Sequence, residues 1–166
     1  MDSTLGQTGV VYNGTSFIAK AIMFFTRAQA FHTVVGLADG LCVSADVTGV
    51  QVREMSDYGN IVWSQFPLNE EQAQASADWA LSKVGKPYAF LDYPLLIWTA
   101  ITGMRWPRWI RKRFSSDQSY FCSELSDGAL THGARITVFD DGRDLSEVTP
   151  ADFQRLFEEY GWWPEN

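Results

Sequence analysis

Residues 31–55 have the sequence FHTVVGLADGLCVSADVTGVQVREM, and this stretch decides the fold. Three runs of β-branched and other apolar residues are separated by Asp39-Gly40 and by Thr48-Gly49. Asp-Gly between two such runs is the usual signal of a tight two-residue hairpin turn. The stretch therefore predicts a three-stranded antiparallel meander.

Further strands and helices are expected on both sides of this meander. Two segments rich in β-branched and aromatic residues, 8–13 and 60–66, predict two more strands, and 136–139 is a candidate for another. Apolar residues at helical spacing predict four helices, over 16–30, 69–84, 122–132 and from Thr149 onward. The first of these helices is apolar around most of its circumference, so we expect it to be largely buried. A meander with helices outside it makes an α+β domain, and we expect residues 1–166 to form a single domain.

Two of the predicted helices have well-marked starts. Asn69 is a favourable N-cap, and Glu70 follows it in the first turn, where the helix dipole favours acids. Thr149 precedes Pro150 at the first helical position, and Asp152 completes a capping box. Both starts are therefore predicted from local chemistry alone.

Composition and charge restrict the class of protein. The 166 residues are 46% hydrophobic and 20% charged, which is typical of a globular chain. The net charge of −7 argues against a general nucleic-acid binder, because such proteins carry a basic surface. Two cysteines are too few for a disulfide framework and are compatible with a reducing compartment. We expect neither a cofactor nor a metal ion.

The chain has no segment that predicts export or a membrane span. Its N-terminus, MDSTLGQTGVVYNG, has an early acid and lacks the basic-then-apolar layout of a signal peptide. The longest uncharged apolar run, 93–104, has about a dozen residues, against about 20 needed to cross a bilayer. We therefore expect a soluble protein that is cytoplasmic as synthesised.

Cys122 is the best candidate for a nucleophile, and the chain holds only two histidines that could serve it. The stretch SYFCSELSDGAL places Cys122 at the start of a predicted helix, where backbone N–H groups favour a thiolate and can hold an oxyanion. His32 lies on a strand, which fixes a general base well, although a satisfied, partly buried histidine is an equal alternative. His132 follows Cys122 toward the far end of the same helix, about 15 Å away by helical rise, and is a poor partner.

Several motifs together resemble a known family. FHTVVGLADGLCVSAD (31–46), GKPY (85–88) and YFCSEL (120–125) occur in that order, and VTPADF (148–153) follows them. This order resembles the permuted NlpC/P60 superfamily of papain-like enzymes, in particular its YiiX/YebB-like bacterial and phage branch. The resemblance covers about residues 8–132. It implies a permuted papain-like fold in which a barrel-like antiparallel sheet packs against helices.

The resemblance also implies roles for individual residues. Cys122 corresponds to the family's nucleophile, His32 to its base, and Tyr88 to a residue near the oxyanion site. Where the family often has Glu-Ala on the strand after the histidine, this chain has Ser44-Ala45. Ser44 and Asp46 share a strand face, so either can hydrogen-bond the ring of His32. We favour Asp46, because a carboxylate also stabilises the imidazolium formed in catalysis.

The segment between GKPY and YFCSEL, residues 89–119, is long. It contains PLLIWTAITGM followed by RWPRWIRKRF, so an apolar stretch precedes a basic and aromatic one. Residues 94–113 are therefore a candidate for contact with a membrane surface or an anionic polymer, or for a lid over the active site. The alternative is a helical excursion that buries its Leu and Trp side chains and exposes its arginines.

These observations lead to three hypotheses about function. The first is a thiol hydrolase of peptide amides. The resemblance points to peptidoglycan or a fragment of it as the substrate. It also implies a phage or bacterial protein with a virion-associated or lysis role. The second is an acyl hydrolase or acyltransferase of the same fold that acts on lipids or thioesters. The third is a non-catalytic binding or structural module. The oligomeric state is left open by the sequence.

Overall fold

The computed structural model describes residues 3–87, 122–142 and 145–164. Five strands form one antiparallel sheet with the order β4-β3-β2-β1-β5. The strands are β1 (Thr8–Tyr12), β2 (Ala30–Gly36), β3 (Leu41–Asp46), β4 (Gly49–Glu54) and β5 (Ile61–Trp63). The predicted α+β class, the meander over 31–55 and the two flanking strands are confirmed.

The turn between β2 and β3 has the geometry that its sequence predicts. Asp39 has φ 58° and Gly40 has φ 73°, so both central residues lie in the left-handed region. Two consecutive left-handed residues define the type I′ turn, whose twist matches that of the strands it joins. Asp and Gly are tolerated in this region at low cost, which explains the choice of residues.

Four α-helices accompany the sheet in the described part of the chain. Their bounds are α1 (Phe17–Thr26), α2 (Glu70–Leu81), α5 (Cys122–Gly128) and α6 (Pro150–Glu159). A π-helical turn, η3 (Ala129–Gly133), continues α5, and the short 3₁₀ turns η1 (Met55–Asp57) and η4 (Leu145–Glu147) lie in connections. Asn69 caps α2 and Thr149 caps α6, each in a reciprocal capping box. Both predicted helix starts are confirmed.

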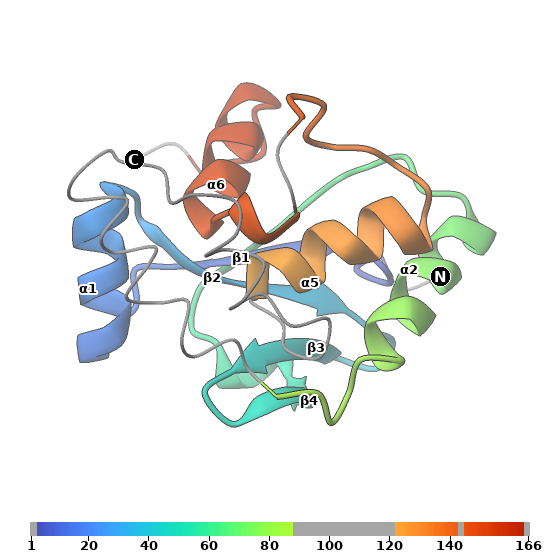
Figure 1. Cartoon of the computed structure of the whole chain (residues 1–166), viewed down its shortest axis with the longest axis horizontal. Coiled ribbons are helices and arrows are strands. Elements are labelled where there is room, and N and C mark those ends of the chain that lie inside the picture. Colours follow the sequence, from blue (N-terminus) through green and yellow to red (C-terminus); the bar gives the residue numbers. More distant parts are fainter. Residues whose placement is uncertain (1–2, 88–121, 143–144, 165–166) are drawn as a thin grey trace, which may run out of the picture.

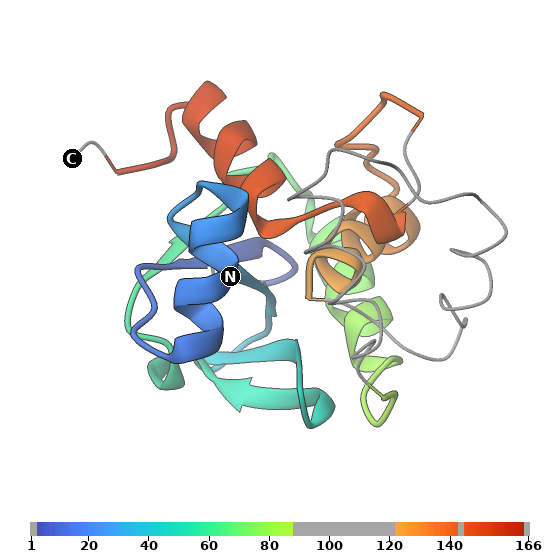
Figure 2. The same ribbon diagram turned by 60° about the vertical axis from the view of Figure 1, so that its left-hand side comes forward.

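Helices α2, α5 and α6 cover one face of the sheet (Figures 1 and 2). Val35 of β2 packs there against Leu125 of α5 and Ala77 of α2. Val10 of β1 packs on the same side against the buried Phe153 of α6. We call this side of the sheet the helix face.

The opposite side of the sheet has a smaller apolar cluster, and we call it the loop face. Val11, Val34 and Cys42 are buried there. They are covered in part by Phe31 and by Tyr58, which lies just after η1 in the connection between β4 and β5. Successive residues of a strand point to opposite faces. In β2, Val34 therefore belongs to the loop face, and its neighbours Thr33 and Val35 belong to the helix face.

Two predictions about local structure are wrong. Residues 136–139 form no strand within the described segment 122–142, and the backbone N–H of Ile136 instead bonds to the carbonyl of Leu130. Helix α1 is not largely buried, since Phe17 is 87% exposed and Phe24 is 78% exposed. The helix also ends at Thr26, because Arg27 adopts a left-handed conformation before β2 begins.

No helix among the described residues is both long enough and apolar enough to cross a membrane.

Candidate functional site

The imidazole of His32 is held on the loop face by two polar side chains. Its Nε2 atom lies 2.7 Å from Oγ of Ser44 on the neighbouring strand β3. The ring stacks on the ring of Tyr58, with centroids 5.6 Å apart and an interplanar angle of 27°. A hydrogen bond at one edge and a ring against one face fix both the position and the plane of the imidazole.

Ser44 connects His32 to Tyr58. Its side chain is fully buried, and the hydroxyl of Tyr58 lies within hydrogen-bond distance of its Oγ atom, at 2.7 Å. Sequence reasoning missed Tyr58. The residue lies beyond the end of β4 in a connection without regular structure, so no strand or helix periodicity marks it.

Asp46 does not contact His32 in this structure. Its carboxylate pairs with the guanidinium of Arg53 at 3.0 Å and accepts the backbone N–H of Thr48 at 2.9 Å, and it also bonds to the Thr48 hydroxyl. Burial raises the pKa of this carboxyl, but the bonds from Thr48 and Arg53 outweigh that effect and lower it. The expectation that Asp46 rather than Ser44 bonds the ring is therefore not met, because Asp46 closes the β3–β4 turn.

Cys122 is the first residue of α5, and its side chain is buried, with 3% exposed. Burial raises the pKa of the thiol. Neighbouring donor groups oppose this effect and act to lower the pKa: the backbone N–H and the hydroxyl of Thr33, and the backbone N–H groups of Ser123 and of Cys122 itself. The sulfur thus lies where several donors converge, which is the surrounding that a thiolate or an oxyanion requires.

Helix α5 is anchored to β2 and to the segment before α6. The hydroxyl of Ser126 bonds to that of Thr33 at 3.0 Å, and the hydroxyl of Ser123 donates to the carbonyl of Val148 at 2.5 Å. Both bonds are buried. They fix the N-terminal turn of α5, and with it the thiol, beside the residue that follows His32 in the sequence.

The thiol and the imidazole start from opposite faces of the sheet. Cys122 contacts Thr33 on the helix face, whereas His32 and Ser44 project from the loop face. Next to His32, the regular alternation of side chains between the two faces is interrupted by a β-bulge. Val11 of β1 is paired with His32, but the next residue, Tyr12, is paired with Ala30, so that Phe31 of β2 is an extra residue without a partner in β1. Such a bulge bends the strand and re-aims neighbouring side chains.

The ring of His32 is neutral near pH 7. Burial lowers its pKa from 6.5 to about 4, against a smaller opposing effect of the Asp46 carboxylate. Because the pKa of the Cys122 thiol is raised, the resting site holds a neutral thiol and a neutral imidazole rather than an ion pair.

Other predicted site features are placed as follows. Tyr88, the segment 89–119 and the possible contact region 94–113 lie outside the described residues. Cys42 is a buried apolar residue of the loop face, and burial raises the pKa of its thiol to about 12. His132 is exposed in η3, near the ring of Trp79. Among the described residues, no cluster of three or more His, Cys, Asp or Glu side chains has the geometry to hold a metal ion.

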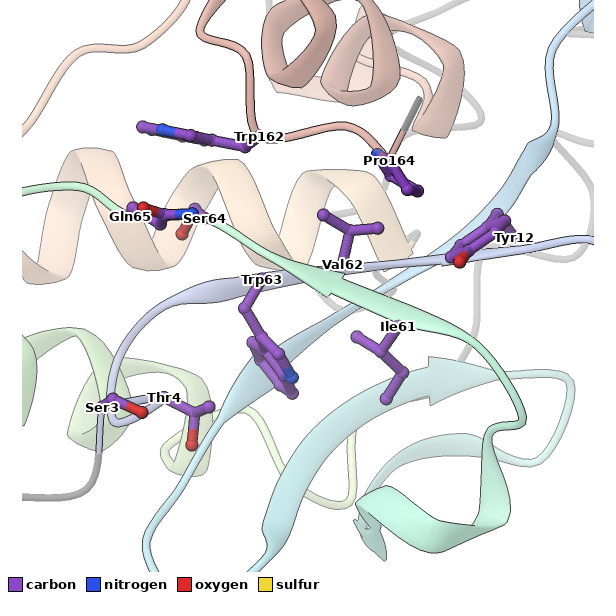
Figure 3. A pocket seen from close by; sticks show the side chains of 10 residues that line it. All are labelled: Ser3, Thr4, Tyr12, Ile61, Val62, Trp63, Ser64, Gln65, Trp162 and Pro164. Carbon is purple, nitrogen blue, oxygen red and sulfur yellow. The ribbon is translucent and has the colours of Figure 1, made fainter. Parts of the chain in front are cut away.

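One open pocket, of about 630 Å³, lies along the edge strand β5, and neither Cys122 nor His32 lines it (Figure 3). Ile61 and Trp63 lie on one side of the strand, and Val62, Trp162 and Pro164 on the other. The rest of its lining is Ser3, Thr4, Tyr12, Ser64 and Gln65. It contains no acid, base or thiol, so we do not assign the chemistry of the molecule to it.

No protein-family model matches the chain, and no curated protein matches its sequence.

Proposed function

We propose that the protein is a cysteine hydrolase in which Cys122 is the nucleophile, His32 the general base and Ser44 the group that orients the base. The supporting observation is the setting of the sulfur. It lies at the first residue of a helix, among four hydrogen-bond donors, and two of these come from the residue after His32. We further propose the permuted papain-like fold implied by the sequence resemblance, in which a histidine-bearing strand precedes a cysteine-bearing helix.

The proposed reaction is acyl transfer. His32 accepts the thiol proton at Nδ1, and the sulfur attacks the carbonyl carbon of an amide to form a tetrahedral intermediate. Backbone N–H groups at the start of α5 stabilise its oxyanion. The imidazolium returns the proton to the leaving amine, which departs and leaves a thioester. Water, deprotonated by His32, then releases the carboxylic acid and regenerates the thiol.

The neutral resting pair supports a role for His32 as a general base rather than as the positive partner of a preformed thiolate. An imidazole with a pKa of about 4 is available as a base over the whole neutral range, although it is a weak one. The convergent N–H groups at the sulfur reduce the cost of ionising the thiol when the substrate arrives.

The substrate we propose is a peptide amide, with peptidoglycan or a related peptide as the leading choice because of the sequence resemblance. Action on lipid or thioester substrates rests on the segment outside the described residues. A binding module without catalysis is the competing candidate, and two observations favour it: the partner of His32 is an uncharged hydroxyl, and the thiol and imidazole start from opposite faces of the sheet.

Alkylation of Cys122 by iodoacetamide distinguishes the candidates. The modified peptide is identified by mass spectrometry, and Cys42 is an internal control because its thiol is buried on the loop face. If His32 serves the thiol, His32→Gln lowers the rate of Cys122 alkylation at neutral pH by about tenfold or more. An unchanged rate, together with no cleavage of muropeptides by the wild-type protein, favours the binding module.

A further inference from the structure

The hydroxyl of Ser44 has two partners but only one hydrogen to donate. Oγ lies 2.7 Å from Nε2 of His32 and 2.7 Å from Oη of Tyr58. Among the described residues, the Ser44 hydroxyl has no other hydrogen-bond partner, and the side chain is fully buried. The direction of its single O–H therefore decides which nitrogen of the imidazole carries the proton.

Two arrangements satisfy these distances and also pair the hydrogen of Ser44, because a hydroxyl both donates and accepts. In the first, Tyr58 donates to Ser44, and Ser44 donates to Nε2 of His32. The proton of the neutral ring is then on Nδ1, and this nitrogen cannot accept another. In the second, Nε2–H donates to Ser44, and Ser44 donates to Oη of Tyr58. Nδ1 is then unprotonated and competent as a base.

We propose that Tyr58 is a positioning residue, which makes the base-competent form of His32 available by accepting the hydrogen of Ser44. A buried serine whose only partner is the imidazole leaves its own hydrogen unpaired when it accepts from Nε2–H, so it favours the arrangement in which it donates to the ring. With Tyr58 as a second partner, the same serine can accept from Nε2–H and still pair its own hydrogen, with Oη of Tyr58. The catalytic part of this inference rests on the proposed function. The effect of Tyr58 on the protonation of the His32 ring does not depend on that function.

The surroundings of Tyr58 support this role. Burial raises the pKa of its hydroxyl to about 12, so the group stays protonated and both arrangements keep their hydrogens throughout the neutral range. Its side chain is half-buried, so its own O–H can turn to water when Ser44 donates to it. Its ring stacks on His32 in either arrangement.

The test is Tyr58→Phe, which keeps the stacked ring and removes only the hydroxyl. Nitrogen-15 NMR of the histidine side chains reports which nitrogen of neutral His32 carries the proton. In the variant, both forms lose a bond to Tyr58, but only the Nε2–H form is left with an unpaired buried hydrogen, on Ser44, so its fraction should fall by about tenfold, the factor that corresponds to one unsatisfied buried donor. Tyr160→Phe is the matched control, because Tyr160 is 57% exposed and its ring contacts Phe66 and Trp162 rather than His32.

A second variant shows that the effect passes through Ser44. In a Ser44→Ala background, Tyr58→Phe should leave the proton distribution of His32 unchanged, because the connection is already broken. The same proton distribution in wild type and Tyr58→Phe overturns the inference. Failure of the proposed hydrolase looks different: the distribution shifts as described, but the alkylation rate of Cys122 does not respond to His32→Gln.

Discussion

The buried imidazole of His32 should make the protein less stable in mild acid. The ring stays neutral in the folded chain down to a pKa of about 4, whereas in the unfolded chain it takes up a proton at its ordinary pKa of 6.5. Below pH 6.5 the unfolded state therefore binds more protons than the folded state, and acid favours unfolding. The stabilisation is complete above pH 6.5 and is lost as the pH falls toward 4.

The size of this effect follows from the shift. Each unit of pKa difference between the two states corresponds to about 1.4 kcal/mol. Lowering the pH from about 7.5 to about 5 should reduce the free energy of unfolding by about 2 kcal/mol through this ring alone, and the reduction reaches about 3 kcal/mol at pH 4.

Urea unfolding followed by tryptophan fluorescence measures the effect, in wild type and in His32→Gln. The glutamine retains a hydrogen-bonding group near Ser44 and does not titrate, so the difference between the two proteins isolates the ring from the carboxylates. His132→Gln removes the other, exposed imidazole and serves as the control. If wild type and His32→Gln lose stability in parallel over this range, the ring is not held neutral, and the description of a neutral resting site is wrong.

Three further predictions concern the framework of the site. Phe153→Ala should lower the free energy of unfolding, measured by chemical denaturation, by about 3–5 kcal/mol, because it leaves a cavity at a fully buried position of α6. Phe24→Ala is the control, and it should change this free energy little, because Phe24 is 78% exposed. Thr149→Ala should cost about 1 kcal/mol by removing the cap of α6, and restoration by Thr149→Ser would show that the hydroxyl is responsible. Gly40→Ala meets no atom within 4 Å but has φ 73°, so it should lower the melting temperature through backbone strain alone, and a neutral result would contradict the assigned turn.

The parts of the fold that follow from neighbouring residues were predictable. Asp39-Gly40 specifies its turn, and Asn69 and Thr149 specify helix starts, because each acts on backbone groups within three residues. The exposure of Phe17 and Phe24 was not predictable, since periodicity shows that a helix is apolar but not whether another element covers it.

The candidate site was predictable only in part, for a similar reason. Alternation along β3 correctly placed Ser44 and Asp46 on one face, but the choice between them depends on Arg53, which pairs with Asp46 from the next strand. Tyr58 reaches Ser44 from a connection that has no periodicity. Both interactions join residues of different elements, and only the folded chain brings them together.

The two sulfur atoms differ in the oxidation chemistry open to them. Cys42 lies beneath the loop face and Cys122 at the start of α5 on the other side of the sheet, and both thiols are free. A disulfide requires the two Cα atoms to lie within about 7 Å, with their side chains directed toward each other. Because the sheet lies between the two thiols, an internal bridge would require the sheet to open first, so a chain oxidised in this way would record an earlier unfolding event.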